Sequence, residues 1–364
     1  MFLPPNELAA LTRPDAVLAI SLVHRPSHAA HPGFCGLLST AHRFGYRVLV
    51  PGWGANSACS SQRAFAGTDS FANKTWARLQ TLADLLGQLP ATLTAVVLDG
   101  FDAVFANDAR HLHESFARWR QQTGRAVAYQ AECNSWPRCY DAWYERAGVR
   151  CPAGLQTCYM NAGVVVGLAA PLAAWLRAAL AIRARRDARE AAWLPRGAKY
   201  IDDQDLLNGA FASGVAERHG VGLDHHSALS LSTMQCTGGR SPSERCRRAS
   251  PRTHAPLAGA TVRTSITTLA SGTTSNGTVM LAGGNAPSIV HCNGNAGKRL
   301  SLRLCERLAL AHPSPPSDAP VLLLPGYDQP SRSFHDVCSG VRVPGRLRGR
   351  GATTLVREWE SVGA

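Results

Sequence analysis

Apolar positions in the first half of the chain follow two alternating patterns, short continuous runs and helical repeats. The runs of β-forming residues occupy 16–22, 46–50, 95–98, 125–129 and 163–167. Between them, apolar residues recur every three or four positions, as from Trp76 to Leu86. Repeated strand–helix units predict an α/β fold, a Rossmann-type, mostly parallel sheet flanked by helices. Ligands bind such sheets outside the carboxyl ends of the strands, so the residues after each run are the first candidates for a site.

The pattern changes in the second half of the chain. Residues 237–257 are rich in Ser, Pro, Gly and Arg, which indicates an irregular loop insertion. Short Thr, Val and Ile runs from 260 to 290 predict a small antiparallel element that leads into a strand at His291. Beyond 313 the composition turns to Pro, Ser, Gly and Arg, and we expect the last forty or so residues to pack poorly. We therefore divide the chain into a domain at 1–312 and a tail at 313–364.

Composition describes a globular chain with a basic surface. Of its 364 residues, 45% are hydrophobic and 17% charged, and the net charge is +13. A basic surface favours anionic partners, nucleic acid included, but aromatic residues do not interleave with the basic clusters, so we expect no dedicated nucleic-acid binding. No apolar run approaches the roughly 20 residues of a membrane span. The first residues show no basic segment followed by a long apolar block, so we expect no signal peptide in this chain.

Cysteine usage indicates an oxidising compartment. The chain has 11 cysteines, and its densest set, Cys133, Cys139, Cys151 and Cys158, contains no C-x-x-C pair. That spacing argues against structural zinc and favours disulfides. Two N-x-T triplets, at Asn73 and Asn276, are compatible with the same compartment.

The chemistry-bearing residues follow two of the predicted strands. The stretch AVVLDGFDAVF, 95–105, ends a β-forming run in Asp99 and Asp102, and SIVHCNG, 288–294, ends another in His291. Two carboxylates and an imidazole at strand ends suit a divalent cation that in turn holds a diphosphate. Each segment taken alone is explained as well by turn aspartates or by an ordinary histidine. The metal interpretation therefore requires the three side chains to meet in space.

Six segments in a fixed order carry a resemblance to a known family. They are LDGFDAVF (98–105), AECNSWP (131–137), YMNAGVVVG (159–167), IDDQDL (201–206), GLDHHS (222–227) and IVHCNG (289–294). Their order resembles the glycosyltransferase domain of the procollagen lysyl hydroxylase family, over roughly residues 17–298. The resemblance implies a GT-A-like fold and sugar transfer from a UDP-sugar with Mn²⁺, with Mg²⁺ as the alternative cation.

The resemblance also implies roles for individual residues. Metal ligands would be Asp99, Asp102 and His291. Donor-binding residues would be Ser21, Trp53, Lys74, Phe101, Asn161, Asn293, Gly294 and Lys298. Residues acting on the sugar or the acceptor would be Asp202, Asp203, Glu132 and Trp136.

Several of these positions have structural alternatives or depart from the family. Phe101 could stack on uracil or pack under the sheet, and Trp136 could cover the donor or belong to the core. Acids at the start of a helix, such as Asp202, also cap free N–H groups. Cys292 stands where the family has a glycine, and Lys298 lies one residue further from the histidine than expected.

The resulting prediction is a transferase that moves glucose or galactose from UDP to a hydroxyl acceptor. By resemblance the acceptor is hydroxylysine or galactosyl-hydroxylysine in a collagen-like protein, and the location is the lumen of the endoplasmic reticulum or Golgi, or outside the cell. We find no candidate residues for the hydroxylase half of the larger family members. The alternative is a non-catalytic module that binds a nucleotide-sugar or glycan, against which the three retained metal ligands argue.

Overall fold

The computed structural model describes the elements that surround the predicted site. The described residues are 13, 15–21, 32–51, 71–132, 140–149, 158–184, 202–232, 286–293, 320–324, 331–333 and 338.

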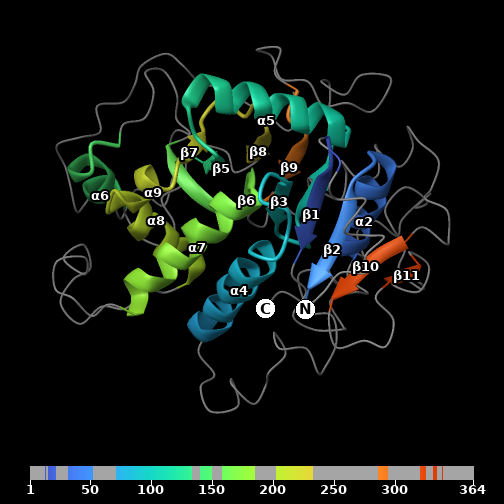
Figure 1. The fold of residues 1–364 in the computed structure, drawn as a ribbon, viewed down its shortest axis with the longest axis horizontal. Coiled ribbons are helices and arrows are strands. Elements are labelled where there is room, and N and C mark those ends of the chain that lie inside the picture. The colour runs from blue at the N-terminus through green and yellow to red at the C-terminus, as the bar shows by residue number, and fades with distance from the viewer. Residues whose placement is uncertain are drawn as a thin grey trace, which may run out of the picture.

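The main sheet has eight strands among these residues (Figure 1). Their order across the sheet is β11 (Ser331–Ser333), β10 (Pro320–Leu324), β2 (Arg47–Pro51), β1 (Val17–Ser21), β3 (Thr94–Leu98), β6 (Tyr159–Leu168), β5 (Val127–Glu132) and β7 (Val221–Asp224). Strand β6 runs antiparallel to both of its neighbours, and β11 is antiparallel to β10. The other neighbouring pairs are parallel. The predicted α/β class with a mostly parallel sheet is confirmed.

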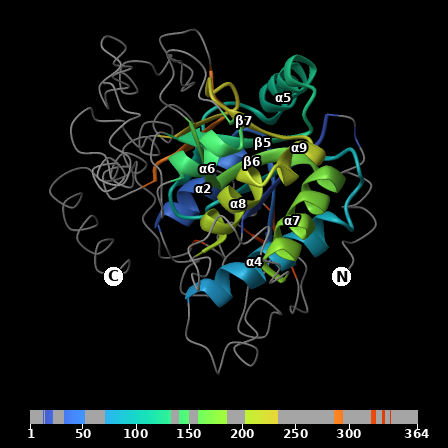
Figure 2. The same cartoon turned by 90° about the vertical axis from the view of Figure 1, so that its left-hand side faces the viewer.

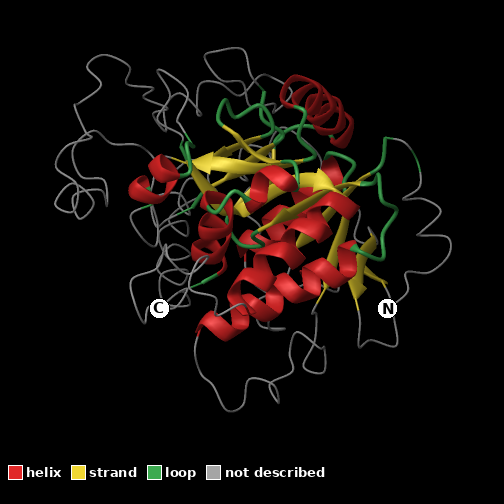
Figure 3. Cartoon of the chain, turned by 60° about the vertical axis from the view of Figure 1, so that its left-hand side comes forward, coloured by secondary structure: helices red, strands yellow, loops and turns green. Residues whose placement is uncertain are grey.

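Helices cover both faces of this sheet, because alternate strand residues point to opposite sides. One face packs against α4 (Phe71–Leu86), α6 (Asp141–Arg146), α7 (Ala169–Ala184), α8 (Asp203–Ala212) and α9 (Val215–Arg218). The other packs against α2 (Pro32–Arg43) and α5 (Ala109–Thr123). Figure 2 shows α4 and α7 on one side of the strands and α5 on the other, and Figure 3 shows helices on both sides of the strands.

A second, small sheet lies beside the first and carries the histidine. Its order is β4 (Ala103–Phe105), β9 (Ile289–His291) and β8 (Ser230–Ser232). Strand β9 is antiparallel to β4 and parallel to β8. The expected small element is therefore mixed, and its strands come from three distant segments. The predicted insertion at 237–257 and the short runs at 260–285 lie outside the described residues.

The C-terminal segment differs from the expected tail. The apolar run at 320–324 forms β10, which extends the sheet beside β2, and Cys338 forms a disulfide with Cys35 of α2. The physical reason is local: five apolar residues suffice for a strand that pairs with β2 on one side and β11 on the other, although the surrounding composition resembles a linker. A disulfide is compatible with the oxidising compartment predicted from the cysteines. Within the described ranges, no helix is long and apolar enough to cross a membrane.

Candidate metal centre

The candidate site lies at one edge of the main sheet. The parallel strands β1, β3, β5 and β7 end there in Ser21, Leu98, Glu132 and Asp224, and the antiparallel β6 begins there near Asn161. Each of these four strands brings a polar side chain to the same edge. In β1, β5 and β7 it is the last residue of the strand, and after β3 it is the next residue, Asp99. This is the edge at which sheets of this class bind ligands.

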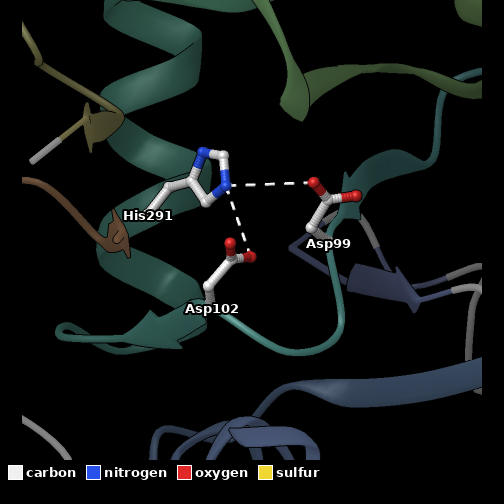
Figure 4. A group of neighbouring side chains, drawn as sticks. All are labelled: Asp99, Asp102 and His291. Carbon is white, nitrogen blue, oxygen red and sulfur yellow. Dashed lines mark ion pairs between the residues drawn. The ribbon is translucent and has the colours of Figure 1, made fainter. Parts of the chain in front are cut away.

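Asp99, Asp102 and His291 meet at this edge (Figure 4). Each offers one ligand atom, and these atoms all lie within 4.8 Å of one another. The Nε2 atom of His291 is 3.4 Å from Asp102 Oδ1 and 3.9 Å from Asp99 Oδ2. The convergence on which the metal interpretation depends is therefore present.

Strand pairing explains why residues nearly two hundred positions apart meet. Asp99 and Asp102 stand at the two ends of the tight turn between β3 and β4. Strand β4 pairs with β9 so that Ala103 is opposite His291, and the Cys292 N–H donates to the Asp102 carbonyl at 2.6 Å. On the other side of the turn, the Asp99 N–H donates to the Gly163 carbonyl of β6 at 2.8 Å. The turn is thus held by one hydrogen bond to each sheet.

His291 is buried, with 2% of its surface exposed, and both ring nitrogens face polar groups. Its Nδ1 lies 2.9 Å from Oε1 of the buried Gln130. Burial opposes the imidazolium, but the Asp102 and Asp99 carboxylates favour it, and the pKa of His291 is raised above its ordinary value. A cation and a proton would therefore compete for Nε2. Two carboxylate oxygens and one imidazole nitrogen form a donor set that fits Mn²⁺ or Mg²⁺.

Gly163 leaves the space that the histidine ring fills. A Cβ atom at this position would lie 2.2 Å from His291 Cε1 and 2.8 Å from Nε2. Real Cβ atoms essentially never approach a heavy atom below 3.0 Å. The glycine is therefore required for the histidine to adopt this position.

Arg78 of α4 joins Asp99 to Asp203 of α8, and sequence reasoning missed it. Its Nη2 lies 2.7 Å from Asp99 Oδ1, and its Nη1 lies 3.6 Å from Asp203 Oδ2. Burial would lower the pKa of Arg78, but these two carboxylates outweigh it, and the pKa is raised. The sequence signal was a lone arginine four positions before the buried Leu82, on the side of the helix that faces the sheet.

Glu132 is the centre of a second polar group. It is 1% exposed and accepts hydrogen bonds from Gln204 Nε2 at 3.1 Å and from Asn293 Nδ2 at 2.6 Å. Burial raises the pKa of Glu132 to about 7. Gln204, which sequence reasoning also missed, accepts from the Ala162 N–H at 3.3 Å as well. In the sequence, the feature that could have pointed to Gln204 was its position between Asp203 and Asp205.

The acids at the start of α8 divide between two environments. Asp202 is the N-cap of the helix and accepts a hydrogen bond from the Asp205 N–H at 2.8 Å. It thus has the helix-capping role that the sequence offered as the alternative to sugar binding. Asp203 points toward Arg78, and burial raises its pKa. Asp203 is therefore the α8 acid that shares Arg78 with Asp99.

The remaining predicted residues fall into three groups. Ser21 is buried beside Gly100, and Phe101 packs at a tilt against Phe34, with ring centroids 6.4 Å apart. Asn161 is buried, and its Oδ1 accepts from the Gly163 N–H at 2.7 Å. Lys74 belongs to α4, but the structure describes only its backbone. Trp53, Trp136, Gly294 and Lys298 lie outside the described residues.

Comparison with known proteins finds distant structural likenesses. No protein-family model matches the sequence, and no curated protein matches it. A galactosyltransferase, LgtC, solved with donor and acceptor sugar analogues, aligns with a TM-score of 0.39 at 17% identity, over 79% of this chain and 95% of that one. Mouse xyloside xylosyltransferase 1, apo form, aligns with a TM-score of 0.38 at 11% identity, over 77% of this chain and 98% of that one. At such TM-scores, function has to be argued from the site itself.

Proposed function

We propose that this chain is a metal-dependent glycosyltransferase that moves glucose or galactose from a UDP-sugar to a hydroxyl acceptor. The observation that carries the proposal is the meeting of Asp99, Asp102 and His291 at the carboxyl edge of the sheet. An arrangement of two acids and one imidazole at this edge is suited to a cation that holds a diphosphate. The order of the six sequence segments supports the same activity.

The three residues would hold Mn²⁺ or Mg²⁺, which when bound neutralises the charge that develops on the UDP leaving group. Arg78 holds one oxygen of Asp99, and this leaves Asp99 Oδ2 on the side of His291. Of the neighbouring polar side chains, Asp203 is partly exposed and suited to hydrogen-bond sugar hydroxyls, whereas Glu132 and Asn161 are buried and hydrogen-bonded within the protein. Burial favours protonated Glu132 near neutral pH, and in that form its carboxyl group could donate as well as accept.

The finer assignments depend on the resemblance alone. We infer from it that the acceptor is hydroxylysine or galactosyl-hydroxylysine of a collagen-like protein. The same resemblance favours Mn²⁺ as the cation and the lumen of the endoplasmic reticulum or Golgi, or secretion, as the location. It also suggests donor contacts for Ser21, Phe101 and Asn293 and a sugar contact for Asp202.

UDP release tests the proposal directly. The purified chain is incubated with UDP-glucose or UDP-galactose and Mn²⁺, and released UDP is measured before and after chelation and after Mn²⁺ is restored. We expect release with one donor that stops on chelation and returns with the metal. Asp102→Ala should abolish it, whereas Asp84→Ala, which removes an exposed acid of α4, should not.

Two outcomes would contradict the proposal. Full release by folded Asp102→Ala would remove that residue from the site. Saturable binding of the UDP-sugar without any release, with a range of hydroxyl acceptors present, would favour the alternative of a non-catalytic binding module.

A further inference from the structure

Gln130 is a buried polar residue inside a strand, where an apolar side chain would be expected. Along β5, Ala128 and Gln130 point to one face of the sheet and Tyr129 to the other. The face of Gln130 is the one beside the small sheet that carries His291. The glutamine is 0% exposed, and its Oε1 lies 2.9 Å from His291 Nδ1.

This contact is part of a regular register. Gln130 of β5 contacts His291, the last residue of β9. Two residues further along each segment, Glu132 contacts Asn293. The strand pairing of β5 and β6 also shifts between Tyr129 and Gln130, and this brings Gln130 opposite Asn161. The backbone therefore determines which β5 side chain faces the imidazole.

A glutamine carbonyl selects one form of a neutral imidazole. A carbonyl oxygen only accepts hydrogen bonds, so Nδ1 must carry the proton, and a neutral ring has only one N–H. The lone pair then belongs to Nε2, which is the atom that faces Asp102 and Asp99. The opposite form would direct an N–H into the space between the ring and the two acids, where a cation could not then bind Nε2.

The rest of the glutamine gives no structural reason for its presence. Among the residues that the structure describes, no group accepts a hydrogen bond from Gln130 Nε2, and this atom is buried. A buried N–H without an acceptor is costly, and an apolar side chain of similar size would avoid the cost. The carbonyl contact with His291 is thus the one feature of Gln130 that an apolar residue could not supply.

We propose that Gln130 is a positioning residue that holds His291 in the Nδ1–H form, so that Nε2 can bind a divalent cation. The inference deepens the proposed function, because it concerns the same metal site. It predicts that Gln130 acts through its ability to accept a hydrogen bond, and not through its volume.

Mn²⁺ binding to the full chain without any sugar tests this role. Free Mn²⁺ is titrated by electron paramagnetic resonance against the unchanged chain, Gln130→Leu and Gln130→Glu. Gln130→Leu, which removes the acceptor at similar volume, should bind Mn²⁺ about 10- to 100-fold more weakly. Gln130→Glu, which keeps an acceptor, should bind at least as tightly as the unchanged chain. The exposed Gln121→Leu is the matched control. Equal Mn²⁺ affinity of folded Gln130→Leu and the unchanged chain would overturn the inference.

A second measurement needs no variant of Gln130. Long-range ¹H–¹⁵N spectra of the metal-free chain labelled at histidine report the tautomer of each neutral ring, and His291→Ala assigns the signal among 13 histidines. At a pH where the ring is neutral we expect the Nδ1–H form, and the Nε2–H form would overturn the inference. If the unchanged chain binds no Mn²⁺, the proposed metal dependence fails, but this spectrum still decides the tautomer.

Discussion

Replacing Gly163 by alanine tests the geometry of the candidate metal centre most directly. The added Cβ would lie 2.2 Å from His291 Cε1, whereas ordinary contact begins at 3.4 Å. The ring must therefore retreat at that atom from 2.2 Å to at least 3.0 Å, and to 3.4 Å for ordinary contact. Strand β9 is paired on both sides, and Nδ1 is held by Gln130, so the ring cannot make this movement and keep Nε2 between the two acids.

The expected effects follow from the size of this displacement. Metal–ligand distances are specified to about 0.2 Å, so Mn²⁺ affinity should fall by more than about tenfold. A displacement of about 1 Å at a reacting site costs on the order of 100-fold in rate, which is the loss we expect in UDP release. Overpacking of the core should lower the free energy of unfolding by about 1–3 kcal/mol.

Mn²⁺ titration, UDP release and urea unfolding measure the three effects. Gly167→Ala is the matched control, because Gly167 belongs to the same strand and its added Cβ would come no closer than 3.2 Å to Val127. The control should keep its Mn²⁺ affinity and its UDP release. A folded Gly163→Ala variant with the Mn²⁺ affinity of the unchanged chain would show that His291 does not hold the cation as we describe.

Three further predictions concern charge, pH and the disulfide. Arg78→Met should lower the free energy of unfolding by about 1–3 kcal/mol in metal-free buffer, because two facing carboxylates lose their shared cation, and saturating Mn²⁺ should recover part of the loss; equal urea curves for the two proteins would contradict this. Burial raises the pKa of Glu132 from 4.5 to about 7, so the stability that its bound proton contributes is complete below about pH 4.5 and lost as the pH rises through about 7. Glu132→Gln should therefore gain stability relative to the unchanged chain from about pH 5 to about pH 8, by up to about 3 kcal/mol in urea unfolding, and a pH-independent difference would refute the shift. Changing Cys35 and Cys338 together to serine should lower the free energy of unfolding by about 2–5 kcal/mol and speed amide exchange in β10, as measured by urea unfolding and hydrogen exchange.

The sequence by itself determined the local elements and the candidate acids. Runs of β-forming residues correspond to β1, β2, β3, β5 and β6, because a buried strand in an α/β sheet must be apolar on both faces. The run at 95–98 pointed to Asp99, since the residues after a strand end are the ones that reach a ligand edge, whereas Glu132 and Asn161 were named from the resemblance. Composition misled where a short apolar run, 320–324, stood inside a segment rich in Pro and Ser.

Only the tertiary structure decided which of these residues meet. The antiparallel direction of β6 and the antiparallel pairing of β4 with β9, which places Ala103 opposite His291, are long-range choices that no local pattern contains. Arg78 and Gln130 were missed for the same reason. One is a single charge on a helix and the other a single amide in a strand, and neither has a meaning until a distant segment is placed against it. Side-chain partners are set by the packing of layers, which in this chain brings Gln130 against His291, 161 positions away.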